Sequence, residues 1–148
     1  MTSYLNQARD TIEQIRDFYP DLTARWEDHE DGFGFSLEYL EQAGLAFDVT
    51  LVFREDDTLQ LEAPDLVVEY FPCGESDVQE RFVDVACGLI DGRYRIVYFR
   101  RGSRLLKSQL QIPSGDTWKP TATHYCGLWA LWPWWKLSEE AVQNVAAV

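Results

Sequence analysis

The chain has 148 residues, a formal net charge of −12, and a composition that is 46% hydrophobic and 14% aromatic. This length and apolar content predict a single globular domain over residues 1–148 and exclude an intrinsically disordered chain. The excess of acids repels phosphate backbones, so we expect no nucleic-acid partner. The sequence has neither a signal-peptide pattern nor an apolar run of about 18 residues, so we expect a cytoplasmic protein with no membrane partner.

The charge is unevenly distributed along the chain. Residues 1–91 carry 22 acids and 5 bases, a net charge of −17, whereas residues 92–148 carry 3 acids and 8 bases, a net charge of +5. An acidic surface raises the association rate of a basic partner, so the asymmetry favours a charged partner protein. The alternative is that the acids only keep the protein soluble.

The first predicted element is an amphipathic helix that ends at Pro20. Its apolar side chains recur at spacings of three and four residues and are Leu5, Ala8, Ile12, Ile15 and Tyr19. Residues 20–32 mix acids with proline and glycine, so we predict a loop that Trp26 anchors to the body of the protein.

Four strands of an antiparallel meander are predicted next. Side chains alternate in polarity from Phe33 to Tyr39 and from Leu45 to Phe53, which is typical of half-buried strands. Residues 59–62 and 66–71 are predicted to be the third and fourth strands, and turn-forming residues separate the four.

A central helix and a hairpin follow. Ser76 and Gln79 have the spacing of a capping box and Asp91-Gly92 is a typical helix stop, so the pattern predicts a helix between them. Residues 93–100 and 104–112 alternate in polarity on either side of a glycine-containing turn, as the two strands of a hairpin do.

The C-terminal part of the chain is rich in aromatic residues. Residues 118–135 have no regular period, whereas residues 137–147 are predicted to form a short helix. The tryptophans of this part are Trp118, Trp129, Trp132, Trp134 and Trp135. Exposed indoles are costly and tryptophan is enriched at binding hot spots, so the last four belong either to the core, which we favour, or to an interface.

Together these elements predict an α+β fold. Its antiparallel sheet has about six strands, a four-strand meander plus a hairpin. An N-terminal helix, a central helix and an aromatic C-terminal tail complete it.

The sequence has no clear pattern of a catalytic, metal or cofactor site. His29, His124 and Cys126 lack a recognisable orienting group and oxyanion hole, which a Cys–His hydrolase needs. Cys73 and Cys87 do not supply the paired ligand spacing of a zinc site. We therefore predict buried, reduced thiols, no cofactor, no metal and no enzymatic activity.

Two acidic runs and one basic cluster are candidate interaction sites. The acids of residues 27–31 and 55–57 are Glu27, Asp28, Glu30, Asp31, Glu55, Asp56 and Asp57. We interpret the first run as a solvated loop because it lacks the ligand alternation of a calcium loop. The basic side chains of the hairpin are Arg93, Arg95, Arg100, Arg101, Arg104 and Lys107. We expect this cluster to pair with the protein's own acids, and recognition of a phosphate or an acidic partner is the alternative.

These features favour a protein that binds another protein. The leading hypothesis is an inhibitor of the bacterial immunity (antitoxin) type, which neutralises a cognate, basic toxin or effector. The two acidic runs would attract the partner. Four indoles would anchor it, those of Trp129, Trp132, Trp134 and Trp135.

Three alternatives stay open at this point. The runner-up is a secretion or assembly chaperone for an exported effector, which would hold an extended or apolar segment. Less favoured is a small-molecule-binding or enzymatic domain with a pocket around His124 and Cys126. A homodimer is also compatible with the aromatic tail.

Overall fold

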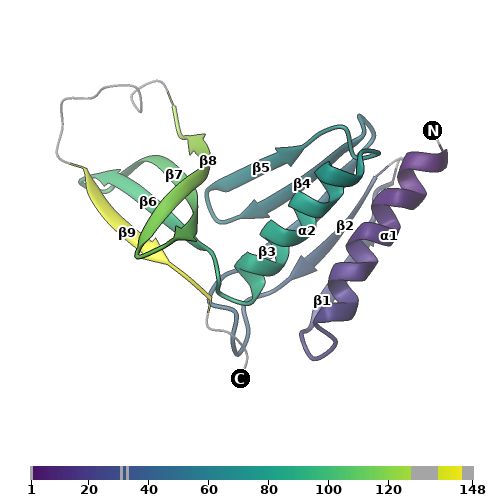
Figure 1. Cartoon of the computed structure of the whole chain (residues 1–148), viewed down its shortest axis with the longest axis horizontal. Helices are drawn as coiled ribbons and strands as arrows, with labels where there is room; N and C mark the ends of the chain where they lie inside the picture. Colours follow the sequence, from purple (N-terminus) through teal and green to yellow (C-terminus); the bar gives the residue numbers. More distant parts are fainter. Residues whose placement is uncertain (1, 31, 33, 128–136, 145–148) are drawn as a thin grey trace.

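A computed structural model describes residues 2–30, 32, 34–127 and 137–144 (Figure 1). The helices in these residues are α1 (Thr2–Phe18) and α2 (Ser76–Ile90). One antiparallel sheet contains β1 (Ala24–Asp28), β2 (Phe35–Tyr39), β3 (Val49–Arg54), β4 (Thr58–Ala63) and β5 (Leu66–Tyr70). The second contains β6 (Arg95–Arg101), β7 (Arg104–Ser114), β8 (Thr117–Tyr125) and β9 (Ser138–Val142). The predicted α+β fold, with its N-terminal and central helices, is confirmed.

The five-stranded sheet is a meander in which each strand pairs with the next along the chain. Alternation in the sequence decides which side chains it buries. Phe35 and Leu37 of β2 are at most 1% exposed, whereas Ser36 between them is only partly buried. The register places Leu37 opposite Leu51, so the apolar positions of neighbouring strands share one face. The predicted meander corresponds to β2 to β5.

The predicted loop over residues 20–32 is wrong in its middle part, because Ala24–Asp28 forms the edge strand β1. Ala24 and Trp26 pack against the core, and the residues next to them are exposed. Three charged side chains among five residues obscure this alternation, and charges are common on edge strands. Trp26 does anchor the segment, since its ring stacks on that of Phe35 with centroids 5.0 Å apart.

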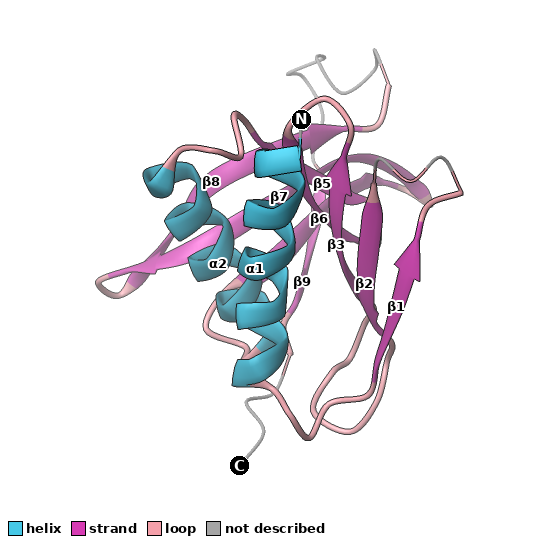
Figure 2. Ribbon diagram, turned by 90° about the vertical axis from the view of Figure 1, so that its right-hand side faces the viewer, coloured by secondary structure: helices cyan, strands magenta, loops and turns pink. Residues whose placement is uncertain are grey.

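Both helices cover one face of the five-stranded sheet and lie side by side (Figure 2). Ile12 and Ile15 of α1 and Phe82 and Leu89 of α2 are completely buried there. Burying one such side chain contributes about 1.5–3 kcal/mol, so packing on the sheet stabilises the helices more than propensity does. Neither helix of the described residues has the length and apolarity that crossing a bilayer requires.

The start of α2 differs from the predicted capping box. Ser76 is already helical, Glu75 precedes it in an extended conformation, and no side chain caps the helix. The Gln79 amide instead donates to the carbonyl of Cys73 at 2.6 Å. The predicted stop is confirmed, since the helix ends before Asp91.

The four-stranded sheet has the order β8-β7-β6-β9. Its centre is the predicted hairpin, whose turn contains Gly102 at a φ of 60°. β8 was not predicted, because Lys119 and Pro120 interrupt its alternation. The helix predicted over residues 137–147 is wrong at Ser138–Val142, which pairs with the open edge of β6. Long-range pairing therefore outweighs local preference there.

Hydrogen bonds hold the second sheet against the first. The Tyr98 hydroxyl donates to the carbonyl of Pro64 at 2.5 Å, and the Ser108 hydroxyl donates to the carbonyl of Asp65. One cluster of buried apolar side chains includes Ile96 and Leu110 of this sheet together with residues of the helices and the meander. The two sheets therefore share a core.

Candidate functional site

The strand order brings separate acidic segments to one end of the five-stranded sheet. In an antiparallel meander the β1–β2 and β3–β4 connections lie at the same end. The Cys73 amide donates to the carbonyl of Asp57 at 2.9 Å, which joins the β5–α2 connection to this end. We name this surface the acidic end and define it as Glu30, Glu55, Asp56, Asp57 and Glu75. All are exposed except the partly buried Asp57.

The described ion pairs leave this charge uncompensated. Two neighbouring bases pair with other acids: Arg54 lies 3.9 Å from Glu69, and Arg81 lies 3.4 Å from Asp77. Within the described residues, no ion pair involves a member of the acidic end. The acidic end therefore presents a concentrated negative potential to solvent.

The remaining acids of residues 27–31 are placed differently. Arg9 donates to the Asp28 carboxylate at 2.8 Å and the Trp26 indole donates to it at 3.2 Å, and these bonds lower the pKa of Asp28. Glu27 is exposed and follows Trp26 on β1, so it points to the sheet face opposite the helices. Asp31 lies outside the described residues.

The predicted indole anchors at residues 129, 132, 134 and 135 also lie outside the described residues. Trp118 is described on β8, where the Arg95 guanidinium lies 4.3 Å from its ring centroid. The described part of the aromatic tail therefore stacks on a base of the neighbouring hairpin. Core packing and an interface both stay predictions for the other four indoles.

The basic cluster of the hairpin is partly neutralised. Arg93 lies 3.0 Å from Asp91 and Arg100 lies 3.7 Å from Glu140, which are the expected ion pairs. Lys107 lies 4.6 Å from the ring centroid of an aromatic neighbour, Phe99. These contacts tie several bases to the protein itself.

The cysteines and histidines are not assembled into one site. Burial raises the pKa of the Cys73 thiol to about 11, and it also raises the pKa of Cys87 and Cys126. His124 is on β8, whereas His29 is in the β1–β2 connection. In the described part of the chain, no group of three or more His, Cys, Asp or Glu residues could hold a metal ion.

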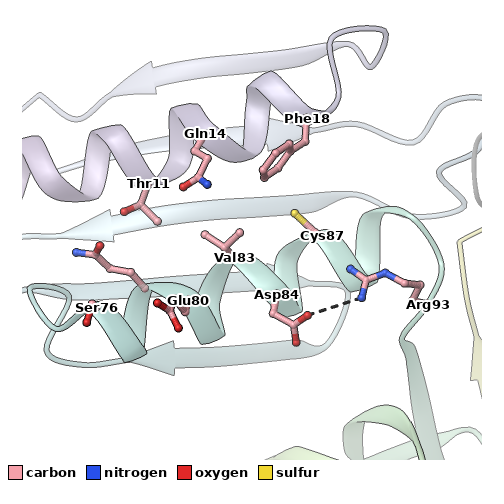
Figure 3. Close-up of a pocket in the computed structure, with 10 residues that line it drawn as sticks. Thr11, Gln14, Phe18, Ser76, Glu80, Val83, Asp84, Cys87 and Arg93 are labelled. Atoms are coloured by element: carbon pink, nitrogen blue, oxygen red, sulfur yellow. Dashed lines mark ion pairs between the residues drawn. The ribbon is translucent and has the colours of Figure 1, made fainter.

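A groove of about 470 Å³ lies between the two helices (Figure 3). Thr11, Gln14 and Phe18 point from α1 toward α2, and Val83 and Cys87 point back from α2. Thr11 and Cys87 are 6% and 8% exposed and lie at the floor, whereas Phe18 is 56% exposed. The groove thus offers apolar contact area to a ligand or a partner.

The α2 side of the groove carries acids. Glu80 and Asp84 are both exposed there. Asp84 lies 3.7 Å from Arg93 and accepts a hydrogen bond of 2.6 Å from the Tyr94 hydroxyl, so its carboxylate is held in place. Glu80 forms no ion pair with a described residue.

A second cleft, of about 330 Å³, lies between β5 and β8. Among the described strands, each lies at the edge of its sheet, so on that side no described strand of the same sheet pairs with its main-chain groups. Val68, Tyr70, Ile112 and Ala122 line the cleft together with Phe71, which is 65% exposed. The charged side chains of Glu69, Arg81 and Asp84 also line it. The edge strands and the apolar part of the lining suit an extended peptide.

The groove was not predicted from the sequence, although α1 carries a pattern that marks it. One stripe of α1 is uncharged while the other solvent-facing positions of the helix are largely charged. The stripe has spacings of three and four residues and consists of Tyr4, Gln7, Thr11, Gln14 and Phe18. Without the position of α2, this stripe is indistinguishable from an ordinary polar surface.

Comparison with known proteins gives no relative from which a function could be carried over. No protein-family model matches the chain, and neither the curated proteins nor the solved structures contain a match to it.

Proposed function

We propose that the protein is a cytoplasmic inhibitor of the bacterial immunity type, which binds a basic toxin or effector through its acidic end. The observation that carries the proposal is the meeting of five carboxylates from three chain segments, none ion-paired to a described residue. Toxins that act on nucleic acid need cationic active sites, and such a site is complementary to this surface.

Inhibition would follow from coverage of the cationic site. At physiological salt the Debye length is about 8 Å, so uncompensated carboxylates attract a basic partner most strongly just before contact. The attraction raises the association rate, and the partner's active-site cations then form charge-assisted hydrogen bonds with the inhibitor in place of substrate.

The test begins with affinity capture of the partner from the native cell at low and high salt. The captured protein is then produced alone and its association rate measured against three forms of the inhibitor. These are the unmodified chain, a variant with Glu55, Asp56 and Asp57 reversed to lysine, and a control with three exposed acids from other places reversed. The control acids are Asp21, Glu41 and Asp116.

We expect the acidic-end variant to associate about tenfold or more slowly with a flatter salt dependence, because it loses electrostatic steering. The control carries the same change in net charge and should associate clearly faster than that variant. Co-expression with the partner should restore growth of a toxin-producing cell only when the acidic end is intact. Equal effects of the two variants, or no protection by the unmodified chain, would contradict the proposal.

The second candidate function is a chaperone, and the β5–β8 cleft favours it. An extended segment of an exported protein could pair with either edge strand and place apolar side chains against Phe71 and Ile112. Capture by this surface should resist salt, unlike capture by the acidic end. His124 and Cys126 line neither the groove nor this cleft, so we propose a binding protein and not an enzyme.

A further inference from the structure

We infer that the groove between α1 and α2 binds an amphipathic helix of the partner, with apolar side chains along one face and lysine or arginine on both flanks. The inference rests on the proposed function. It adds a surface that contributes binding affinity, since electrostatic steering by the acidic end mainly raises the association rate. Its support comes from groove geometry, exposed apolar anchors and flanking charge.

The geometry suits a helix that lies along the groove. The two helices run in the same direction, because Tyr4 of α1 packs on Gly74 just before α2, and Tyr19 after α1 donates to the carbonyl of Cys87 at 3.2 Å. The residues that line the groove extend from Ser76 to Cys87 on α2, about 17 Å at 1.5 Å per residue. A partner helix of about three turns matches this length.

Exposed apolar side chains lie in and beside the groove. Phe18 lines it and is 56% exposed, and the partly buried Val83 lines it from α2. Tyr4, which is 41% exposed, lies beyond the lining residues and packs against Gly74. Aromatic anchors in a groove are typical of helix recognition, where side chains at spacings of three and four residues fill the space between two helices.

The flanks of the groove specify a cationic partner. The two helices together carry six acids and three bases. Asp10 of α1 and Glu80 of α2 are exposed and form no ion pair with a described residue. Among the described residues that line the groove, Arg93 is the one base, and it lies 3.7 Å from Asp84 and 3.0 Å from Asp91. Lysine or arginine beside the apolar stripe of the partner would therefore face uncompensated acid.

The probe is a synthetic 18-residue peptide of leucine and lysine, with leucine at helical spacings so that one face is apolar. A second peptide of the same composition has its leucines distributed around the helix. Both carry the same fluorophore, and binding is measured by anisotropy with the full chain at about physiological salt. We expect the amphipathic peptide to bind at least about tenfold more tightly than its scrambled form. Equal or absent binding would overturn the inference.

Two matched pairs of substitutions locate the binding surface. Phe18→Ser with Val83→Ser removes apolar contact from the groove without changing charge, and we expect it to weaken binding about tenfold. Phe71→Ser with Val67→Ser is the control, since it makes the same two replacements at exposed side chains on or beside β5. Binding within about twofold of the unmodified chain is expected for the control. A larger loss in the control than in the groove variant would overturn the assignment and identify the β5–β8 cleft.

A second measurement does not depend on the folding of any variant. Amide chemical shifts of the unmodified chain are recorded with and without the amphipathic peptide. The largest changes should fall on groove residues such as Gln14 and Gln79, and changes confined to Glu55 and Asp56 would overturn the inference. Changes confined to Glu55 and Asp56 would leave the proposed function intact. Normal binding of the peptide together with no protection of toxin-producing cells would refute the proposed function and not the groove.

Discussion

Gly88→Ala, which adds one methyl group to α2, tests how closely Tyr94 packs on this helix. A Cβ atom there would lie 2.2 Å from Cδ2 and 2.4 Å from Cε2 of Tyr94. The ring is restrained, because the Tyr94 amide donates to the Gly88 carbonyl at 2.8 Å and its hydroxyl donates to Asp84 at 2.6 Å. Elsewhere in a helix, Gly→Ala raises the free energy of unfolding by about 1 kcal/mol. Overpacking costs about 1–3 kcal/mol and outweighs that gain, so we expect Gly88→Ala to lower the free energy of unfolding by up to about 2 kcal/mol.

The assay is urea unfolding of a double-mutant cycle, followed by circular dichroism. Tyr94→Ala removes the ring, so adding Gly88→Ala to that variant should raise the free energy of unfolding by about 0.5–1 kcal/mol. The sign of the Gly88→Ala effect should therefore reverse between the two backgrounds, with a coupling of about 2 kcal/mol. Stabilisation by Gly88→Ala in the unmodified chain, or equal effects in both backgrounds, would refute the reasoning.

Three further predictions concern buried polar groups. At about pH 8 a disulfide reagent should modify Cys126 faster than Cys73 in single-cysteine variants. The reason is that Cys126 is less buried and that the thiol of Cys73, with a pKa of about 11, stays protonated. Equal rates of modification would contradict this. Asn144→Ala should lower the free energy of unfolding by about 2–4 kcal/mol, because its 3% exposed amide pairs with a main-chain N–H before β3 and a carbonyl of α2. The exposed neighbour variant Gln143→Ala is the control and should lower it by less. Tyr98→Phe should lower it by about 1–2 kcal/mol through loss of the bond to the β4–β5 turn, and an unchanged urea midpoint would argue against that bond.

Elements with a clear polarity pattern of their own were predictable from the sequence. The apolar side chains of α1 and the alternating apolar side chains of β2 and β3 pack on the core, so the periodicity of the sequence identifies these elements. β1 and β9 are edge strands with many charged residues. Each adopts the strand conformation because it pairs with a neighbour, β1 with β2 and β9 with β6. For β9 the local sequence Ser-Glu-Glu resembles a helix start, and only the open edge of β6 overrides it. Such a partner is invisible to a local pattern.

The candidate site was predictable as composition but not as geometry. The acidic runs are evident in the sequence, yet Glu75 joins Glu55 and Asp56 only because the meander returns to the same end before α2 begins. Asp28 carries the same charge but does not belong to the acidic end, because Arg9 of α1, which is remote in sequence but close in space, neutralises it. The charge that a partner meets is thus a property of the strand order and ion pairs together.

Substitutions in the acidic end and in the groove should affect different rate constants of binding. Charge reversal at Glu55 or Asp56 should lower the association rate and its dependence on salt, since these side chains act before contact. Substitution of Phe18 or Val83 should instead raise the dissociation rate, because apolar contacts form only in the bound complex. If one partner uses both surfaces through separate contacts, the two sets of changes should add in free energy to within about 0.5 kcal/mol. A groove substitution that slowed association as strongly as charge reversal would show that the helix forms part of the first encounter, which would join the two surfaces into one interface.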